Sequence, residues 1–273
     1  MKRRWGLTAI GAVITAAYLF PVYWMVATSL KDRGDIFSSP PKWVPWPPKF
    51  EAYQTAVLDN PVMLRALGNS AIIAFGTVIM TLLLAAPAGY GMARLKLRWT
   101  GLMMLPFLIS QLVPTINLAV PLYLIFSRTG LVNTQLSLII ANTIITLPFA
   151  VILLRPFFLR VPTELEEAAA TDGCGRFGAF WRIVLPIVRP GLLTVAVFAF
   201  VMTWGEFAMG LTLTTDEKVQ PVTVILNQFI GQYGTEWAPL MAASTIVALP
   251  IVILFVGLQR LVVGGLAAGA VKE

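Results

Sequence analysis

Apolar residues in this chain are gathered in long runs that alternate with shorter polar segments. The runs cover approximately residues 5–30, 69–91, 101–126, 136–158, 187–213 and 237–263. A helix needs about 20 predominantly apolar residues to cross the hydrocarbon core of a bilayer, and each run meets that length. The pattern therefore predicts an all-α integral membrane protein with six transmembrane helices.

Composition supports the membrane interpretation. Hydrophobic residues make up 58% of the 273 positions, charged residues only 12%, and the mean hydropathy is +0.80. Soluble domains carry roughly 25% charged residues, about twice the fraction in this chain. The net charge of +7 does not indicate nucleic-acid binding, because the basic residues cluster at the ends of the apolar runs.

The first apolar run follows a short basic segment, Lys2-Arg3-Arg4. A cleaved signal peptide would start in the same way, but its apolar core spans roughly 7–15 residues. This run continues to Leu30, so we interpret residues 1–30 as a first transmembrane helix with a cytoplasmic N-terminus. Residues 31–66, rich in proline and tryptophan, are predicted to form an external loop.

Residues 67–263 are predicted to form a core of five further spans. The third span contains Pro106, Pro114 and Pro121. Proline frees backbone carbonyls that need protein or water partners within a membrane, so we expect a kinked helix that lines a cavity. With these six spans, most of the 20 Lys and Arg residues fall on the same side of the membrane as the N-terminus. The positive-inside rule therefore places the segment 160–186 and the C-terminus in the cytoplasm.

The segment 160–186 is the least hydrophobic part of the second half of the chain, and we predict two short helices joined by a turn. Thr163 and Glu166 have the spacing of a capping box, and Gly173 supplies the positive φ that ends the first helix. One face of this helix has small central side chains, so a partner backbone could approach it closely. That face is formed by Leu165, Ala168, Ala169 and Asp172.

The spacing of residues in this segment forms a longer motif. Glu-Ala-Ala is followed by three residues, a glycine, nine residues and Ile-x-Leu-Pro; the matching residues are Glu167, Ala168, Ala169, Gly173, Ile183, Leu185 and Pro186. The motif resembles the EAA loop of membrane subunits of bacterial ABC importers. The resemblance implies that these residues, with Asp172, form a coupling helix that docks on a cytoplasmic ATPase subunit. ATP and Mg would be bound by that partner, and no cofactor is expected in this chain.

Several kinds of chemistry are excluded by what the sequence lacks. The chain has no histidine and one cysteine, Cys174, which excludes histidine triads, histidine-ligated metals and an intrachain disulfide. It has no Walker A motif, and the G-x-G-x-x-G match over Gly173–Gly178 follows a predicted helix instead of a strand. We therefore expect neither an enzyme nor a metal site.

Polar and aromatic side chains within the spans are the candidates for a substrate path. Glu206 is the only acidic residue placed in a predicted span, where a carboxylate is by default functional; the alternative is that it reaches headgroups or water. Trp204 and Phe207 offer faces for a sugar ring, or simply pack. Asn117 and Asn142 complete the set, with hydrogen bonds between helices as their alternative role.

Further motifs are spread over the whole chain. They include Asn69-Ser70, Pro121-Leu122-Tyr123, the stretch 130–134, Arg155-Pro156-Phe157-Phe158 and the tail 264–273. With the EAA loop, they resemble the maltose-type branch of sugar ABC permeases, and specifically its second, shorter permease subunit. The branch commonly has Trp-Asn in the fifth span where this chain has Trp204-Gly205-Glu206, so no substrate contact is carried over.

The resemblance implies a type I ABC importer permease fold with both termini cytoplasmic, in the bacterial inner membrane. The implied partners are a second permease subunit in a heterodimer, an ATPase dimer, an extracytoplasmic sugar-binding protein and membrane lipid, with no nucleic acid. In that branch the C-terminal tail reaches between the ATPase subunits. Residues expected to make this contact are Gly269, Ala270, Val271 and Lys272.

The implied function is ATP-driven import of a carbohydrate, either an oligosaccharide or a related sugar or polyol phosphate. An ABC permease for a non-sugar solute is the first alternative, because the EAA loop does not select the solute. An ion-coupled secondary transporter that uses Glu206 is a second alternative, and it predicts transport by the chain alone, driven by a gradient. A membrane-embedded enzyme is disfavoured by the absence of histidine and of paired carboxylates in the spans.

Overall fold

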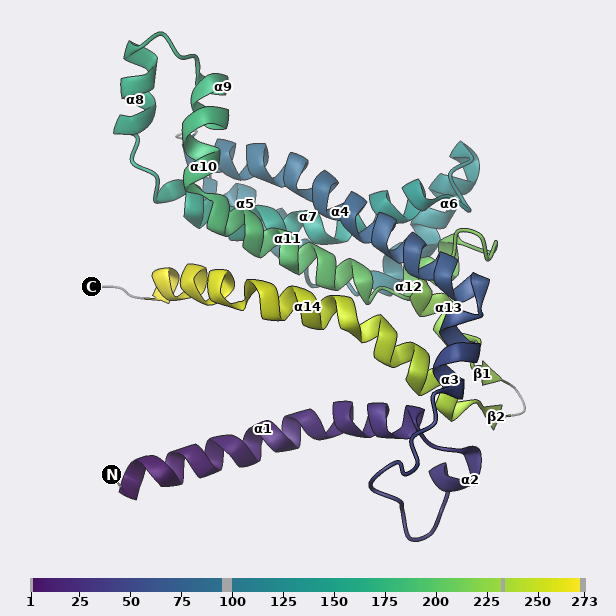
Figure 1. Cartoon of the computed structure of the whole chain (residues 1–273). Coiled ribbons are helices and arrows are strands. Elements are labelled where there is room, and N and C mark those ends of the chain that lie inside the picture. Colours follow the sequence, from purple (N-terminus) through teal and green to yellow (C-terminus); the bar gives the residue numbers. More distant parts are fainter. Residues whose placement is uncertain (1, 95–99, 232–233, 271–273) are drawn as a thin grey trace. The chain divides into compact units, whose positions relative to one another are not determined.

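The computed structural model describes residues 2–94, 100–231 and 234–270, and these are mainly helical (Figure 1). The helices are α1 (Lys2–Ser29), α2 (Arg33–Ile36), α3 (Glu51–Tyr53), α4 (Pro61–Arg94), α5 (Thr100–Ser110), α6 (Ala119–Thr129), α7 (Gln135–Leu159), α8 (Glu164–Thr171), α9 (Arg176–Ala179), α10 (Leu185–Ile187), α11 (Arg189–Trp204), α12 (Ala208–Leu213), α13 (Val222–Asn227) and α14 (Trp237–Ala270). Short π-helical segments cover Gln54–Leu58 and Phe180–Val184, and a 3-10 helix covers Thr115–Leu118. A hairpin of β1 (Ile230–Gly231) and β2 (Gly234–Thr235) precedes α14.

Four of the described helices are long and apolar enough to cross a membrane. They are α1 over Gly6–Ser29, α4, α7, and α14 over Trp237–Gly257. Two bent pairs add up to two more spans: α5 with α6, bent by 91°, and the helix over Arg176–Ile187 with α11, bent by 77°. The chain is therefore a multi-pass membrane protein, with up to six spans in its described residues.

The second span begins at Pro61 instead of the predicted Asn69, inside the segment that we assigned to the external loop. Its start has a local cause. The Asn60 side chain accepts hydrogen bonds from the backbone N–H groups of Val62 and Met63, both at 3.1 Å, which is the role of an N-cap. Proline at the first helical position is also favourable, because its missing N–H would have no partner there.

Two predicted spans are broken, and the last is longer than expected. Pro114 has an extended backbone with ψ 129° and separates α5 from the 3-10 helix before α6. By contrast, Pro106 lies inside α5 and Pro121 inside the first turn of α6. The fifth span ends at Trp204, and α12 follows as a separate helix. The last helix, α14, continues to Ala270 and includes most of the predicted tail.

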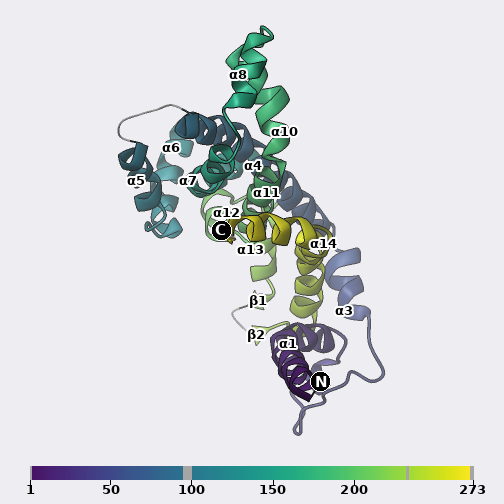
Figure 2. The same cartoon turned by 90° about the vertical axis from the view of Figure 1, so that its left-hand side faces the viewer.

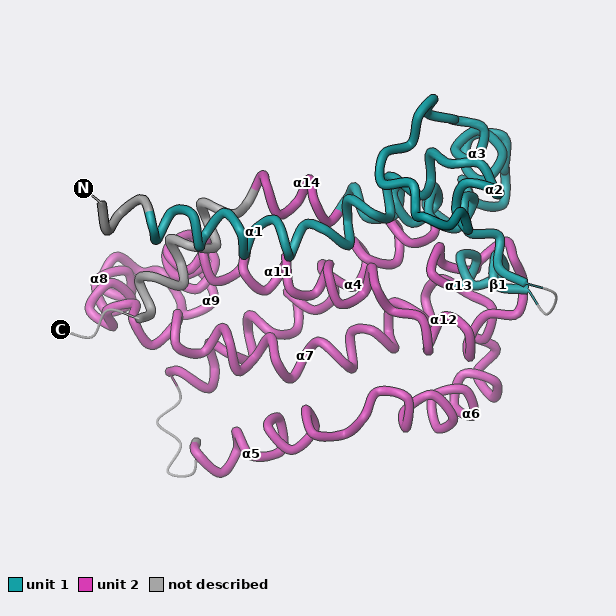
Figure 3. Tube along the Cα trace, turned by 90° about the horizontal axis from the view of Figure 1, so that it is seen from below, with its two compact units in different colours: residues 1–67, 224–250 teal, residues 68–223, 251–273 magenta. Residues whose placement is uncertain are grey.

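The chain forms two compact units (Figure 3): residues 1–67 with 224–250, and residues 68–223 with 251–273. Within the first unit, the start of α14 is linked to the loop after α1. The Arg33 guanidinium and the Glu236 carboxylate form an ion pair at 2.6 Å, and the Ser29 and Tyr53 hydroxyls are 2.6 Å apart. The segment 31–66 therefore belongs to one compact unit with residues 224–250.

The second unit has a core in which α4, α7 and α11 meet. Its buried side chains are Ala85, Ala86, Ala150, Val151, Leu154, Phe158, Val161, Phe180, Val184, Val188 and Val195. Small residues bring these helices close together. A Cβ at Gly191 of α11 would lie 2.6 Å from the ring of Phe157 in α7, so only glycine fits this crossing.

Polar side chains form hydrogen bonds between the helices and loops of the second unit. The Thr81 and Thr146 hydroxyls are 2.8 Å apart and link α4 to α7, a common role for polar groups within spans. Asn69 donates to the carbonyls of Lys218 and Gln220 at 2.9 and 3.0 Å. Asn133, with φ 62°, accepts from the Thr215 N–H at 2.6 Å.

Candidate functional site

The segment 160–186 forms a helical hairpin, in which α8 and α9 lie side by side. In two views at right angles, this hairpin projects beyond the ends of α4, α7 and α11 (Figures 1 and 2). The second arm of the hairpin runs without interruption from α9 through the π-helical segment to Ile187. It continues one residue beyond Pro186, which lies within α10.

The turn of the hairpin has the geometry predicted for Gly173. Its φ is +81°, in the left-handed region that favours glycine. The Cys174 N–H donates to the Ala169 carbonyl at 2.8 Å, and the Gly173 N–H donates to the Ala170 carbonyl at 3.1 Å. These two bonds form a Schellman motif, which satisfies the last carbonyls of α8.

The predicted capping box is wrong. Thr163 has helical angles, φ −67° and ψ −26°, and within the described structure its side chain makes no capping hydrogen bond. The Glu166 carboxylate is used elsewhere. It accepts a hydrogen bond from Tyr90 and forms an ion pair with Arg94, whose Nε lies 2.6 Å from Glu166 Oε1. A charged partner on α4 outcompetes the local backbone for this carboxylate.

The exposed face of α8 differs from the predicted one. Glu167, Ala168 and Asp172 are exposed, but Ala169 is 6% exposed and packs inside the hairpin. The small side chain of Ala169 therefore serves the close approach of α8 to the second arm, and it is not available to a partner. Of the later motif residues, Ile183, Leu185 and Pro186 are half-buried at the base of the second arm.

Glu206 lies in the break between α11 and α12, where its carboxylate caps the first turn of α12. Its Oε1 accepts from the Met209 N–H at 2.8 Å and its Oε2 from the Gly210 N–H at 3.1 Å. Trp204 is buried and stacks on Phe200, with ring centroids 5.4 Å apart. The carboxylate thus has a structural partner of its own in the described chain.

The other substrate-path candidates lie apart from one another. Asn142 is buried in α7, and its side-chain NH2 group donates to the carbonyl of Leu138 within its own helix at 2.8 Å. Asn117 is exposed in the 3-10 helix before α6. Phe207 is partly exposed beside Glu206. Trp204, Glu206 and Phe207 are brought together only by their adjacency in the sequence.

Replacing Glu206 with glutamine is expected to leave solute uptake within about threefold of the original protein, because an amide oxygen still accepts one of the two N–H groups. Glu206→Ala removes both and is expected to cost about 1 kcal/mol of stability, as for a lost N-cap. Uptake and the thermal midpoint of the purified protein measure the two effects. A Glu206→Gln variant of unchanged midpoint without uptake would show that the carboxylate acts in transport.

The tail contact is covered only in part by the described residues. Gly269 and Ala270 form the last turn of α14, whereas Val271 and Lys272 lie outside the described residues. Helical backbone up to Ala270 extends the tail by about 1.5 Å per residue.

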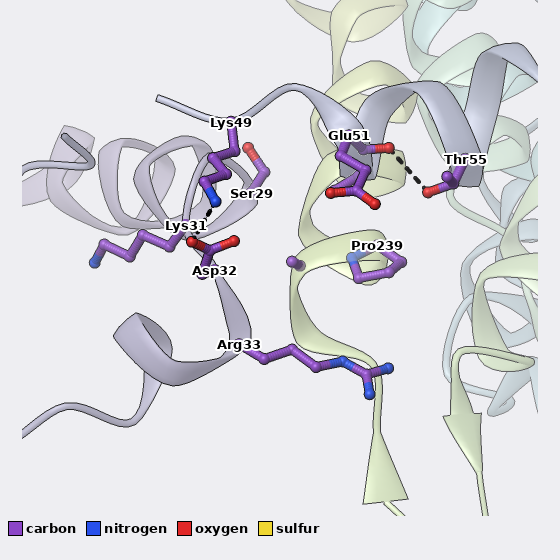
Figure 4. A pocket seen from close by; sticks show the side chains of 10 residues that line it. Ser29, Lys31, Asp32, Arg33, Lys49, Glu51, Thr55 and Pro239 are labelled. Carbon is purple, nitrogen blue, oxygen red and sulfur yellow. Dashed lines mark hydrogen bonds and ion pairs between the residues drawn. The ribbon is translucent and has the colours of Figure 1, made fainter. Parts of the chain in front are cut away.

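A charged pocket lies in the first unit (Figure 4). The Lys49 Nζ is 2.7 Å from the Asp32 carboxylate, and this hydrogen bond and charge raise the pKa of Lys49. Thr55 donates to the carbonyl of Glu51 at 2.9 Å. Exposed ion pairs contribute only about 0–1 kcal/mol, so the Lys49–Asp32 pair adds little stability. Ala238 and Pro239 at the start of α14 also line the pocket.

The hairpin lies within the part of the chain that matches a known protein family. The family model described as "Binding-protein-dependent transport system inner membrane component" matches residues 85–267, which include the whole hairpin. The chain belongs to this family. Among curated family relatives, it is 36% identical to the diacetylchitobiose uptake system permease protein of Streptomyces coelicolor, over 95% of this chain and 94% of the relative. It is 32% identical to the trehalose/maltose transport system permease protein of Thermococcus litoralis, over 97% of this chain and 96% of the relative.

Solved structures show the fold of this family member. A bacterial ABC transporter involved in the import of the acidic polysaccharide alginate matches with a TM-score of 0.80, at 17% identity over 94% of this chain and 96% of that one. The methionine ABC transporter in inward-facing conformations matches with a TM-score of 0.59, at 18% identity over 75% of this chain and 96% of that one. The prediction of a type I ABC importer permease fold is confirmed.

Sequence reasoning missed Tyr90 and Arg94 as parts of the hairpin site. In the sequence, Arg94 is only one of the basic residues that indicate the orientation in the membrane. A partial signal was nevertheless present: Glu166 and Glu167 are adjacent, and adjacent helical residues point about 100° apart, so the two carboxylates face different directions. The sequence did not reveal which of the two faces the protein.

Proposed function

We propose that this chain is one permease subunit of a heterodimeric ABC importer for an oligosaccharide. The observation that carries the proposal is the chemistry named for its near full-length relatives. Among them are permeases for diacetylchitobiose, for trehalose and maltose, and, in Bacillus subtilis, for melibiose, raffinose and stachyose, which are short oligosaccharides. A further relative is named for sulfoquinovosyl glycerol, which is a sugar derivative and not an oligosaccharide. The fold alone is shared with a methionine transporter and selects no solute.

The hairpin is proposed to couple this subunit to a separate ATPase that binds ATP and Mg. Its exposed residues Glu167, Ala168 and Asp172 would meet a groove of that partner. Two apolar side chains of the hairpin support a docking role, since Leu165 is 42% and Phe177 is 77% exposed. Aromatic side chains such as that of Phe177 are enriched at protein interfaces, and Leu165 adds apolar surface beside it. Closure of the ATPase would then move the hairpin, and the helices packed on its base would follow.

The remaining partners follow from the same proposal. An extracytoplasmic binding protein would deliver the sugar, and a second permease would complete the path across the membrane. The hairpin and the tail would face the cytoplasm of a bacterium, because the basic residues favour that side. Gly269, Ala270, Val271 and Lys272 would contact the ATPase dimer. This chain would perform no hydrolysis itself.

Purification of the tagged chain from its membrane in mild detergent, with mass spectrometry of the associated proteins, tests the assembly. The expected result is a second permease together with an ATPase that carries a Walker A motif. The complex is then reconstituted in liposomes and supplied with labelled di- and trisaccharides, the binding protein and ATP. ATP-dependent uptake of amino acids or phosphate in place of sugars would contradict the substrate. Gradient-driven uptake by the chain alone would contradict the ABC mechanism.

A further inference from the structure

The two adjacent glutamates of α8 face in different directions. Glu167 is exposed, whereas the Glu166 side chain is only 16% exposed and points toward the end of α4. The same type of side chain is thus divided between two tasks at neighbouring positions. Glu167 is available to a partner protein, and Glu166 is engaged within this chain.

The Glu166 carboxylate is held by two groups on the last turns of α4. Arg94 Nε lies 2.6 Å from Oε1, and the Tyr90 hydroxyl donates to Oε2. Arg94 also donates from Nη2 to the carbonyl of Val161, at 2.6 Å, in the connection from α7 to α8. The Arg94 side chain is 15% exposed. One guanidinium therefore ties both the start of α8 and the chain before it to α4.

Aromatic packing surrounds this polar contact. The Tyr90 ring lies 4.9 Å from the ring of Phe180, in the second arm of the hairpin, and 5.8 Å from that of Phe158 at the end of α7. Phe158 is fully buried and belongs to the core of the second unit. Such shielding from water strengthens a charged pair and makes the loss of one partner costly.

We propose that Arg94 and Glu166 are positioning residues for coupling: they fix α8 to the end of α4, so that a displacement of the hairpin by the ATPase is passed to the α4 span. The inference rests on the proposed function. It adds a polar connection between α8 and α4 to the covalent links through α7 and α11, and to the packing of the second arm on α4 through Phe180 and Tyr90. The pair carries force between elements of this chain, and it does not contact the ATPase.

A matched pair of substitutions separates the two glutamates. In the reconstituted complex, Glu166→Ala is expected to retain the ATPase on purification and to hydrolyse ATP, while solute transported per ATP falls roughly tenfold, within the range of coupling effects of residues that contact neither ligand. Glu167→Ala is expected instead to weaken ATPase retention. If Glu166→Ala does not accumulate, Arg94→Lys replaces it, because lysine keeps the charge and loses the two-sided contact.

A chemical tether provides the rescue. In a Cys174→Ser background, the double variant Arg94→Cys/Glu166→Cys is expected to transport poorly, and a short bifunctional thiol reagent is expected to restore uptake by rejoining α8 to α4. The single cysteine variants, treated identically, are the control and should gain nothing. Restoration by a neutral tether is an outcome that a mere loss of charge would not give.

The outcomes are distinct. Normal uptake by Glu166→Ala, loss of the ATPase equal to that of Glu167→Ala, or no recovery on tethering would each overturn the positioning role while leaving the importer assignment intact. Absence of ATP-dependent uptake by the unsubstituted complex would instead overturn the proposed function, and with it this inference.

Discussion

Gly173→Pro is expected to abolish solute uptake while the protein remains inserted in the membrane. Proline fixes φ near −65°, whereas Gly173 has φ +81° and donates its N–H to the Ala170 carbonyl. The turn must therefore open, and α8 loses its fixed place on the hairpin. ATP hydrolysis and labelled sugar uptake, measured on the same proteoliposomes, should separate, with hydrolysis persisting and uptake lost.

Alanine substitutions give the control for this experiment. Gly173→Ala should cost about 1–2 kcal/mol for a left-handed residue and reduce uptake partially. Gly175→Ala should leave solute uptake unchanged, because the φ of Gly175 is −66° and no described atom lies within 4 Å of an added Cβ. Uptake by Gly173→Pro at the level of Gly175→Ala would show that the hairpin turn has no part in coupling.

The largest loss of stability is expected at Gly191. A Cβ there would lie 2.6 to 2.9 Å from Cγ and both Cδ atoms of Phe157. These are the ring atoms nearest the Phe157 backbone, and the ring is partly buried against the core, so it has little room to move aside. Gly191→Leu should lower stability by at least about 1–3 kcal/mol, the usual cost of overpacking, and Gly191→Ala by less. The midpoint of thermal unfolding of the purified protein in detergent measures the effect.

Two other glycines make this test specific. A Cβ at Gly76 would also lie 2.6 Å from a neighbour, but that atom is the terminal methyl of Ile139, which can adopt another rotamer. Gly68 is exposed, and no described atom lies near its Cβ position. The expected order of midpoints is Gly68→Ala above Gly76→Ala above Gly191→Ala. Equal midpoints for the three variants would show that the α7–α11 crossing tolerates a wider separation.

The spans and the hairpin turn could be predicted because their signals are local. Length and apolar composition are sufficient to indicate a membrane helix, and a glycine at the end of a helical pattern indicates a left-handed residue. Thr163 shows the limit of such reasoning. Its spacing to Glu166 fits a capping box, but Arg94, far away in the sequence, provides a charged partner that local pattern does not reveal.

The same limit applies to Glu206 and Ala169. An acidic residue inside an apolar run suggested a substrate or ion site, yet the run is broken at that point and the carboxylate caps the helix that follows. A small residue on the helix face suggested room for a partner, yet Ala169 makes room for the second arm of its own hairpin. Both outcomes depend on where a helix breaks or turns back, and hydrophobic pattern alone does not determine this.

The core of the second unit continues from the membrane helices into the base of the hairpin, through Val161, Phe180 and Val184. The tip, with Glu167, Ala168 and Asp172, contributes nothing to that core. Substitutions at the tip can therefore accumulate without a penalty in folding, whereas those at the base cannot. Under the proposed function, an importer of this construction could change its ATPase partner through surface substitutions alone, and keep its transport path unaltered.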